Sequence, residues 1–150
     1  MRLKANCLRS DETGELIHTL ARSSLPTEDV NEQGRSFFRF EDDEGLVGFG
    51  GWEGEGRDRL LRSLVVVEGR QRQGLGSIVL AQLETEAKDA GADRFHLLTT
   101  TAASFFRANG YRDAERVHAP RSIQDCEEFK SLCPASASYL VKELSTAPEA

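Results

Sequence analysis

Long apolar segments are missing from this chain of 150 residues. No run approaches the ~18 apolar residues that a membrane-spanning helix requires, so we expect no membrane partner. The first residues, MRLKAN, hold no apolar segment, which disfavours a secretory signal peptide. Basic residues are also few. There are 19 Lys and Arg against 25 Asp and Glu, a formal net charge of −6, whereas binding a nucleic-acid backbone needs a basic surface.

Cysteine is scarce as well, with residues only at positions 7, 126 and 133. Their spacings match no zinc pattern, and an odd number does not suit a disulfide framework. We therefore predict reduced thiols, no metal and a cytoplasmic location. With 39% hydrophobic and 29% charged residues, the composition is that of a globular chain. We predict a single domain over 1–144, followed by a tail at 145–150.

The spacing of apolar residues predicts strands first, and then an alternation of strands and helices. The expected strands cover 3–7, 37–40, 46–52, 60–67, 95–98, 115–118 and 139–141. The expected helices are one capped by Ser10, a short one capped by Thr27, one from Leu75 to Gly91, and two over 102–109 and 120–131. This order predicts an α/β fold with a mixed sheet.

The most informative segment is the turn at 68–77, EGRQRQGLGS, between a buried strand and an amphipathic helix. Gly74 and Gly76 let backbone N–H groups approach a ligand closely. The free N–H groups and the positive dipole end of the helix point into the same space. Together these features predict a pyrophosphate site, to which Arg70 and Arg72 add positive charge.

Three phosphate motifs compete for this turn. A Walker loop requires Lys-Ser/Thr where this chain has Leu75-Gly76. A dinucleotide fingerprint requires a third glycine where this chain has Val79. The pattern Gln71-x-x-Gly74-x-Gly76 after a strand fits the third motif, because it resembles the coenzyme A pyrophosphate loop of the GNAT acetyltransferase superfamily.

The resemblance covers most of the chain, including 105–111, FFRANGY, which is similar to a short family helix that ends in glycine and an aromatic residue. It implies the GNAT fold, a mixed, mostly antiparallel sheet of about six or seven strands flanked by helices. It also implies acetyl-CoA as co-substrate, no metal, and a pantetheine arm paired with the strand before the turn. The implied coenzyme-binding residues are Leu64, Val65, Val66, Gln71, Arg72, Gln73, Gly74, Leu75, Gly76, Ser77 and Phe106.

A narrower resemblance lies in the C-terminal third. Segments 97–102, 105–106, 110–111 and 128–137 are similar to the GNAT branch that is encoded beside arsenic-resistance genes. That likeness implies N-acetylation of a small, amino-acid-like amine in arsenic or xenobiotic resistance.

Acetyl transfer to an amine has its own chemical requirements. An ammonium with a pKa near ~10 must lose a proton, and we consider Glu53 as a base that acts through a water molecule. The oxyanion needs a donor, for which we expect the backbone N–H of Val66. Many family members carry an acid tyrosine four residues before the glycine of the short helix, but Phe106 stands there. Either Tyr111 replaces that acid, or Tyr111 packs as a core aromatic and water protonates the thiolate, or the protein has lost catalysis.

Five residues are expected around the acceptor. Arg62 and Ser63 lie beside the acetyl position, where Arg62 either binds a substrate carboxylate or extends along the sheet surface. Thr99 and Thr100 either donate hydroxyls to the substrate or cap the next helix. Cys133 either faces the acceptor or is a small buried hydrophobe.

We thus predict an enzyme that transfers acetyl from acetyl-CoA to a small primary amine. Two alternatives stay open: a non-catalytic acyl-CoA sensor, favoured by Phe106, and a protein N-terminal acetyltransferase, disfavoured by the segment 120–134 that closes the pocket. His96 lies between apolar neighbours on a strand and is expected to be structural. A homodimer is common in the superfamily, but no sequence feature predicts an interface.

Overall fold

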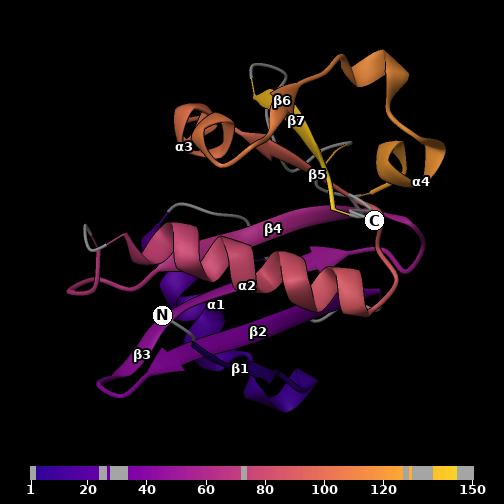
Figure 1. Ribbon diagram of the computed structural model, residues 1–150. Coiled ribbons are helices and arrows are strands. Elements are labelled where there is room, and N and C mark those ends of the chain that lie inside the picture. The colour runs from indigo at the N-terminus through magenta and orange to yellow at the C-terminus, as the bar shows by residue number, and fades with distance from the viewer. Residues whose placement is uncertain are drawn as a thin grey trace, which may run out of the picture.

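The computed structural model describes residues 3–23, 27, 34–71, 74–126, 129 and 137–144 (Figure 1). Arg72, Gln73 and Cys133 lie outside the described residues, as do the tail at 145–150, 127–128 and 130–131 of the last expected helix, and 28–33, where the helix capped by Thr27 was expected. The described residues form an α/β fold around a seven-stranded sheet with the order β1-β2-β3-β4-β5-β7-β6. The predicted fold class is therefore confirmed.

The strands are β1 (Lys4–Cys7), β2 (Arg35–Asp42), β3 (Gly45–Glu53), β4 (Asp58–Val66), β5 (Arg94–Thr99), β6 (Arg112–Asp113) and β7 (Ser138–Glu143). The α-helices are α1 (Gly14–Arg22), α2 (Leu75–Asp89), α3 (Ala103–Ala108) and α4 (Arg121–Gln124), and two 3-10 helices are η1 (Ser10–Glu12) and η2 (Arg116–His118). Neighbouring strands are antiparallel except β4 and β5, which run parallel and are connected through α2.

Helices cover both faces of the sheet, with α2 in front of the strands in Figure 1 and α1 behind them. We call the side that carries α2 and α3 the α2 face. There, Leu83 of α2 and Phe106 of α3 belong to one core with Trp52, Leu61 and Phe95 of the sheet. This core joins β3, β4 and β5, so it fixes the strands that surround the expected coenzyme turn.

The opposite side, which we call the α1/α4 face, has two smaller cores. Helix α1 packs Leu16 and Leu20 against Phe37 of β2. Helix α4 packs Ile123 against Leu60 of β4. The division leaves the middle of this face, between α1 and α4, as the place where polar side chains are buried.

Strand β4 carries an irregularity at Ser63, whose φ of 62° is the only positive φ among the described non-glycine residues. The pair Phe49–Val65 is followed along the strands by the pair Gly51–Arg62, so β4 contains one extra residue. Such a bulge changes the alternation of side chains between the faces. It places Arg62 and Val65 on the same α1/α4 face although they are three residues apart.

The predicted strand at 115–118 is wrong. Residues 116–118 form η2, in which the His118 N–H donates to the Glu115 carbonyl, and the edge strand β6 lies earlier in the chain. Strand β6 takes the place beside β7 through the pairs Arg112–Val141 and Asp113–Leu140. Because β6 already pairs with this edge of β7, residues 116–118 are not needed as a strand and form the 3-10 helix η2.

Two helix starts also differ from expectation. Ser10 begins η1, and α1 starts only at Gly14, because the Glu12 carboxylate accepts the Arg9 N–H and closes a separate tight turn first. Pro120 precedes α4 instead of occupying its first position. The helix expected over 120–131 is also shorter, because α4 ends at Gln124 and a turn follows at Asp125 and Cys126. The other predicted helices and strands that lie within the described residues are present, with ends shifted by one or two residues.

Candidate active site

Strand β4 has a closed half and an open half. Its pairing with β5 consists of Asp58–Arg94, Arg59–Phe95 and Leu60–His96, and then stops. Among the strands that the structure describes, residues 61–66 pair only with β3, over about 20 Å at ~3.3 Å per residue. We call 61–66 the open half of β4. Because backbone groups away from water need partners, this edge can accept an extended ligand.

Val66 presents its backbone to that open edge. The Val67 N–H donates to Val47 of β3, so the alternation of the strand turns the Val66 N–H the other way. The Val66 carbonyl accepts a hydrogen bond of 3.0 Å from the Gln71 carboxamide, which folds the turn back onto the strand. These contacts agree with the expected positions of Val66 as an amide donor and Gln71 as a turn residue.

Helix α2 is the next element in the chain after β4. Gly74 is its N-cap and has a φ of 71°, in the left-handed region that favours glycine. A Cβ placed on Gly76 would lie 3.4 Å from the Phe105 ring and 3.8 Å from a Val66 methyl, so the first turn of α2 abuts both α3 and β4. The free N–H groups at such a helix start suit an anion, and the anion site itself stays a prediction. Leu75 is buried beneath it and Ser77 is half-buried.

Arg70 does not serve this anion site in the structure. Its guanidinium pairs with Asp42 in the β2–β3 turn and donates to the Leu46 carbonyl at 3.1 Å. This correction has an electrostatic reason, because the carboxylate of the hairpin lies on the same side as the Arg70 side chain and neutralises it. The start of α2 contributes positive potential independently of Arg70.

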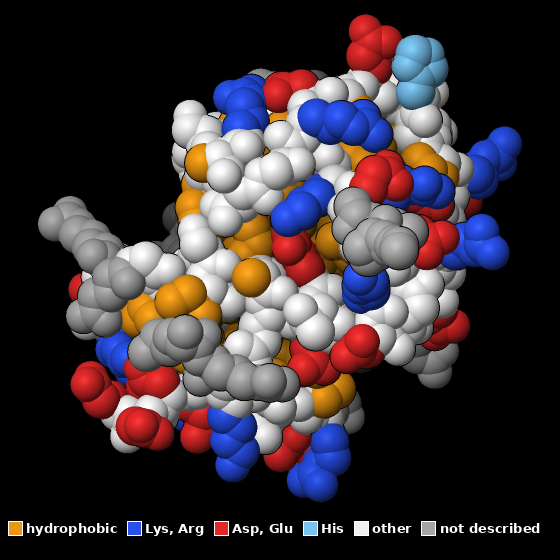
Figure 2. Space-filling model, in the orientation of Figure 1, with side chains coloured by type: hydrophobic (Ala, Val, Ile, Leu, Met, Phe, Trp, Pro, Cys, Tyr) orange, Lys and Arg blue, Asp and Glu red, His pale blue; other side chains and the backbone are white. Residues whose placement is uncertain are grey.

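An apolar surface connects the open half of β4 with α2 and α3. Its members are partly buried and pack on the α2-face core: Leu64, Val66, Ile78, Ala102, Ala103 and Phe105. Figure 2 shows hydrophobic side chains at the surface between α2 and α3. Such a surface, beside unpaired backbone, suits a ligand with an apolar arm and amide groups.

The two aromatic candidates lie deeper than expected. Phe106 packs edge-on against Phe105 and Tyr111 in the core, and Phe105 is the ring that reaches the start of α2. Tyr111 donates a hydrogen bond of 2.8 Å to Glu84, nine residues into α2 and about 13 Å from its first turn. Burial and the Glu84 charge raise the pKa of Tyr111. The packing alternative for Tyr111 therefore agrees with the structure, and we leave it out of the catalytic machinery.

A buried charge cluster occupies the α1/α4 face beside the bulge. Arg62 Nη1 lies 3.8 Å from Glu53 Oε1, and Arg35 Nη2 lies 3.3 Å from Glu53 Oε2. The Arg62 side chain is 0% exposed, so it does not extend along the surface. Glu53 Oε1 is buried and has no hydrogen-bond partner among the described residues. A buried acceptor in this state is costly unless a ligand or water supplies a donor.

Gly51 explains how this cluster is assembled. It lies between Phe37 and Arg62 in adjacent strands, and a Cβ there would come within 2.3 Å of the Ser36 carbonyl and 2.5 Å of the Phe37 ring. Without that Cβ, the Arg62 guanidinium lies 5.6 Å from the centre of the Phe37 ring. This cation–π contact holds Arg62 in place.

The remaining expected acceptor residues have local contacts. Ser63 Oγ accepts from Arg62 Nε at 3.3 Å, so the bulge and the charge cluster are connected. Thr99 Oγ1 accepts the Ala102 N–H at 3.0 Å at the start of α3, which is the capping alternative. Thr100 is exposed. Their roles toward a substrate stay predictions.

Sequence reasoning missed a second polar group on this face. His96 Nε2 lies 2.7 Å from Asp58 Oδ1, and His96 Nδ1 lies 2.7 Å from the Tyr139 hydroxyl. Arg94 also binds Asp58, at 2.7 Å, and Glu143 at 3.3 Å. The parallel register of β4 and β5 brings these residues together, and no local pattern in the sequence indicates it.

The pKa values in this group have separate causes. Burial lowers the pKa of His96, against the opposing effect of Asp58. Burial raises the pKa of Asp58, but hydrogen bonds from Arg94 and His96 lower it by more. Burial and the Asp58 charge raise the pKa of Tyr139 to about 12, and Arg112 opposes this. At neutral pH the group therefore holds a neutral imidazole between a carboxylate and a phenol.

Other kinds of site can be checked over the same residues. No cluster of three His, Cys, Asp or Glu side chains within the described ranges has the arrangement of a metal site. Of the helices that the structure describes, none has the length and apolar character to cross a membrane. Cys7 carries an exposed free thiol, whereas Cys126 is buried and its Sγ donates to the Ser122 carbonyl at 3.3 Å.

Comparison with known proteins gives a family. Residues 33–113, more than half of this chain, match the acetyltransferase (GNAT) domain. A curated protein of Chlorobaculum tepidum, described as an uncharacterised N-acetyltransferase, is 27% identical over 85 residues, which cover 56% of this chain and 54% of that protein. The chain thus spans about half the length of the curated relative that it matches.

Solved structures share the fold at low identity. N-acetylglutamate synthase from Neisseria gonorrhoeae, in complex with coenzyme A and L-arginine, aligns over 95% of this chain and 33% of its own, with a TM-score of 0.75 and 18% identity. Tetrahymena GCN5 aligns over 99% of both chains, with a TM-score of 0.74 and 14% identity. The ribosomal-protein-S18-alanine N-acetyltransferase from Escherichia coli aligns over 98% of this chain and 97% of its own, with a TM-score of 0.71 and 17% identity.

Proposed function

The chain belongs to the GNAT family of N-acetyltransferases, and we propose that it transfers an acetyl group directly from acetyl-CoA to the primary amine of a small, amino-acid-like acceptor within a ternary complex. The observation that carries this proposal is the open half of β4, which leads straight into the glycine-opened start of α2. Both features lie within residues 33–113, the part of the chain that matches the family.

In this proposal the coenzyme follows the strand. The diphosphate binds the first turn of α2 and the residues 71–77, and the pantetheine arm runs back along 64–66 over the apolar surface. The thioester then lies nearest the point where β4 and β5 separate, at Leu60 and His96. The Val66 N–H lies at the other end of the open half, about 20 Å from that point at ~3.3 Å per residue, so we propose it as a donor to the arm and not to the oxyanion.

The acceptor is assigned to the α1/α4 face. Arg62 is a fixed, buried cation close to the same point, and a guanidinium binds a carboxylate in bidentate geometry. Glu53 is held between Arg35 and Arg62, so we propose that it aligns Arg62. The role of Glu53 as a base acting through water stays a prediction.

The fold alone does not choose the acceptor. The similar structures include one enzyme named for glutamate and another named for a ribosomal protein. The resemblance to the arsenic-resistance branch finds no support in the comparisons, and that role rests on sequence motifs only. A cytoplasmic location and a homodimer also stay predictions.

A thiol-release assay with acetyl-CoA tests the proposed function. The panel contains amino acids, the amines that lack their carboxylate, and short peptides. We expect amino acids to exceed the matched amines in kcat/KM by about 100-fold, the value of a buried ionic contact of ~3 kcal/mol. Acetylation of peptides alone would indicate the N-terminal acetyltransferase, and coenzyme binding without thiol release would indicate the sensor.

A further inference from the structure

Three polar side chains form a hydrogen-bonded chain beside the closed end of the gap between β4 and β5. His96 is the β5 residue of the last pair between these strands, and its side chain is buried on the α1/α4 face. It contacts Asp58 with Nε2 and Tyr139 with Nδ1, each at 2.7 Å. An ionised carboxylate only accepts, so Nε2 carries the proton, and Nδ1 accepts the proton of the Tyr139 hydroxyl.

The hydrogen-bonded chain runs from Asp58 through His96 to Tyr139. Tyr139 extends from β7, opposite Leu98, two residues beyond the last β4–β5 pair. Its ring stacks on the His96 ring with an interplanar angle of 11° and packs edge-on against Phe129. The phenol oxygen keeps lone pairs that His96 does not use. Tyr139 is therefore the end of the chain that can accept a further donor.

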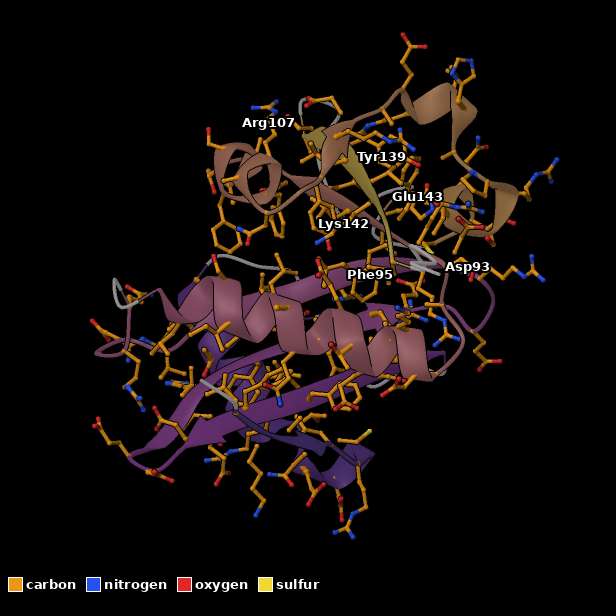
Figure 3. The ribbon with its side chains drawn as sticks, in the orientation of Figure 1. Asp93, Phe95, Arg107, Tyr139, Lys142 and Glu143 are labelled. Atoms are coloured by element: carbon orange, nitrogen blue, oxygen red, sulfur yellow. The ribbon has the colours of Figure 1, made fainter. Side chains whose placement is uncertain are left out.

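Neighbouring charges favour this arrangement. Arg94 binds the same Asp58 oxygen as His96, and Glu143 binds Arg94 in turn. Asp58 therefore stays ionised and can stabilise an imidazolium that forms for a short time. Figure 3 labels Tyr139 and Glu143 on β7, with Lys142 between them in the chain. Lys142 binds Glu84 of α2 and so lies on the other face, away from this group.

We propose that Asp58, His96 and Tyr139 are a proton relay for acetyl transfer, with Tyr139 as the catalytic residue and His96 and Asp58 as positioning residues. The proposal rests on the proposed function, because it requires the acceptor amine at the closed end of the gap. It supplies the proton-transfer group that is missing at Phe106.

The relay balances the protons of the reaction. The acceptor ammonium gives one proton to the Tyr139 oxygen while the Tyr139 proton moves to His96 Nδ1. The freed nitrogen lone pair then forms the N–C bond to the acetyl carbon. When the C–S bond breaks, the thiolate takes a proton from Tyr139, which recovers its own from His96. The second nitrogen proton leaves to water, so the products are amide, free thiol and one released proton.

The test compares the two tyrosines of the chain. We expect Tyr139→Phe to lower kcat about 100-fold, within the usual contribution of a general acid–base group, with KM for acetyl-CoA unchanged. Tyr111→Phe also removes a buried hydroxyl that binds a carboxylate, but it should keep kcat. In His96→Gln the acidic limb of the pH profile of kcat should disappear.

A measurement without an acceptor adds a second readout. The ¹⁵N shifts of the His96 ring, assigned with the His96→Gln variant, should show the proton on Nε2 at pH 7.5. A proton on Nδ1 overturns the relay. If the wild type is active and Tyr139→Phe has the same kcat, the relay is overturned while the proposed function stands. A wild-type protein that releases no thiol with any amine overturns the proposed function, and the relay with it.

Discussion

The two faces of the sheet bury polar side chains in different ways. On the α2 face, Arg59 lies over the Trp52 ring and donates to the backbone carbonyls of Gly56, Glu55 and Ala90. On the α1/α4 face, the buried Arg62 contacts side chains instead, namely Glu53, Ser63 and Phe37. These two arginines are three residues apart on one strand.

The partners indicate different roles. Hydrogen bonds to backbone carbonyls connect the end of α2 to the β3–β4 loop, so Arg59 holds elements together. On the α1/α4 face, charged side chains bind one another beside the open half of β4. One of their polar atoms, the buried Glu53 Oε1, has no hydrogen-bond partner among the described residues and could accept a hydrogen bond from a ligand. We therefore expect substitutions on the α2 face to change stability and those on the α1/α4 face to change activity.

The largest effect is expected when Arg62 and Arg59 are each replaced by methionine. Arg62→Met should lower kcat/KM for the acceptor by 100-fold or more, about 3 kcal/mol, because the carboxylate loses its cation. Arg35 continues to neutralise Glu53 in this variant. Arg59→Met should lower the free energy of unfolding by about 2 kcal/mol, because buried carbonyls lose their donors.

Steady-state kinetics and urea denaturation on both variants measure these effects. The KM for acetyl-CoA serves as the control, since neither arginine lies in the turn at 71–77. The comparison breaks down if Arg62→Met loses stability but keeps its activity per folded molecule.

A smaller effect is expected inside the α2 face. Glu84 accepts from Tyr111 and Lys142, so Glu84→Gln should lower the free energy of unfolding by about 1–2 kcal/mol. Because Glu84 lies far along α2 from the coenzyme turn, kcat should stay within about twofold of the wild-type value. Thermal denaturation and the thiol-release assay check both statements. A large loss of kcat here would remove the distinction between the faces.

The smallest effect is a pH dependence of stability on the α1/α4 face. Burial lowers the pKa of His96 in the folded protein below the ordinary value of 6.5. Below that pH the unfolded chain binds a proton that folded His96 does not, so the free energy of unfolding falls as the pH decreases toward the folded pKa. The contribution is complete above pH 6.5 and its slope is at most about 1.4 kcal/mol per pH unit.

Urea denaturation between pH 7.5 and 5.5 measures this slope. In His96→Gln the decline should be smaller, because that side chain does not titrate. Parallel curves for the two proteins would show that His96 contributes nothing to the acid sensitivity.

Local patterns in the sequence were sufficient for the turn and for most elements. Gly74 and Gly76 identify the start of α2 because a left-handed N-cap and a close approach to Phe105 both suit glycine. The short helix α3 ends before Gly110, whose φ is 97°. These features depend on backbone conformation within a few residues, which composition and spacing express directly.

The polar groups of the α1/α4 face depend on register instead. Asp58 meets His96, 38 positions later in the sequence, because β4 and β5 align in parallel. Glu53 meets Arg62 because of the bulge at Ser63, a non-glycine residue with positive φ that no turn motif signals. Pairing of distant strands fixes such contacts, so the sequence alone left His96 as a structural residue.

Residue-resolved hydrogen exchange with and without acetyl-CoA tests most directly whether the open half of β4 receives the coenzyme. The amide of Val66 points to the open edge, whereas that of Val67 already donates to Val47. We predict that acetyl-CoA protects Val66 and leaves Val67 unchanged. Coenzyme that binds without protecting the Val66 amide, or that fails to bind the folded protein, would contradict this account.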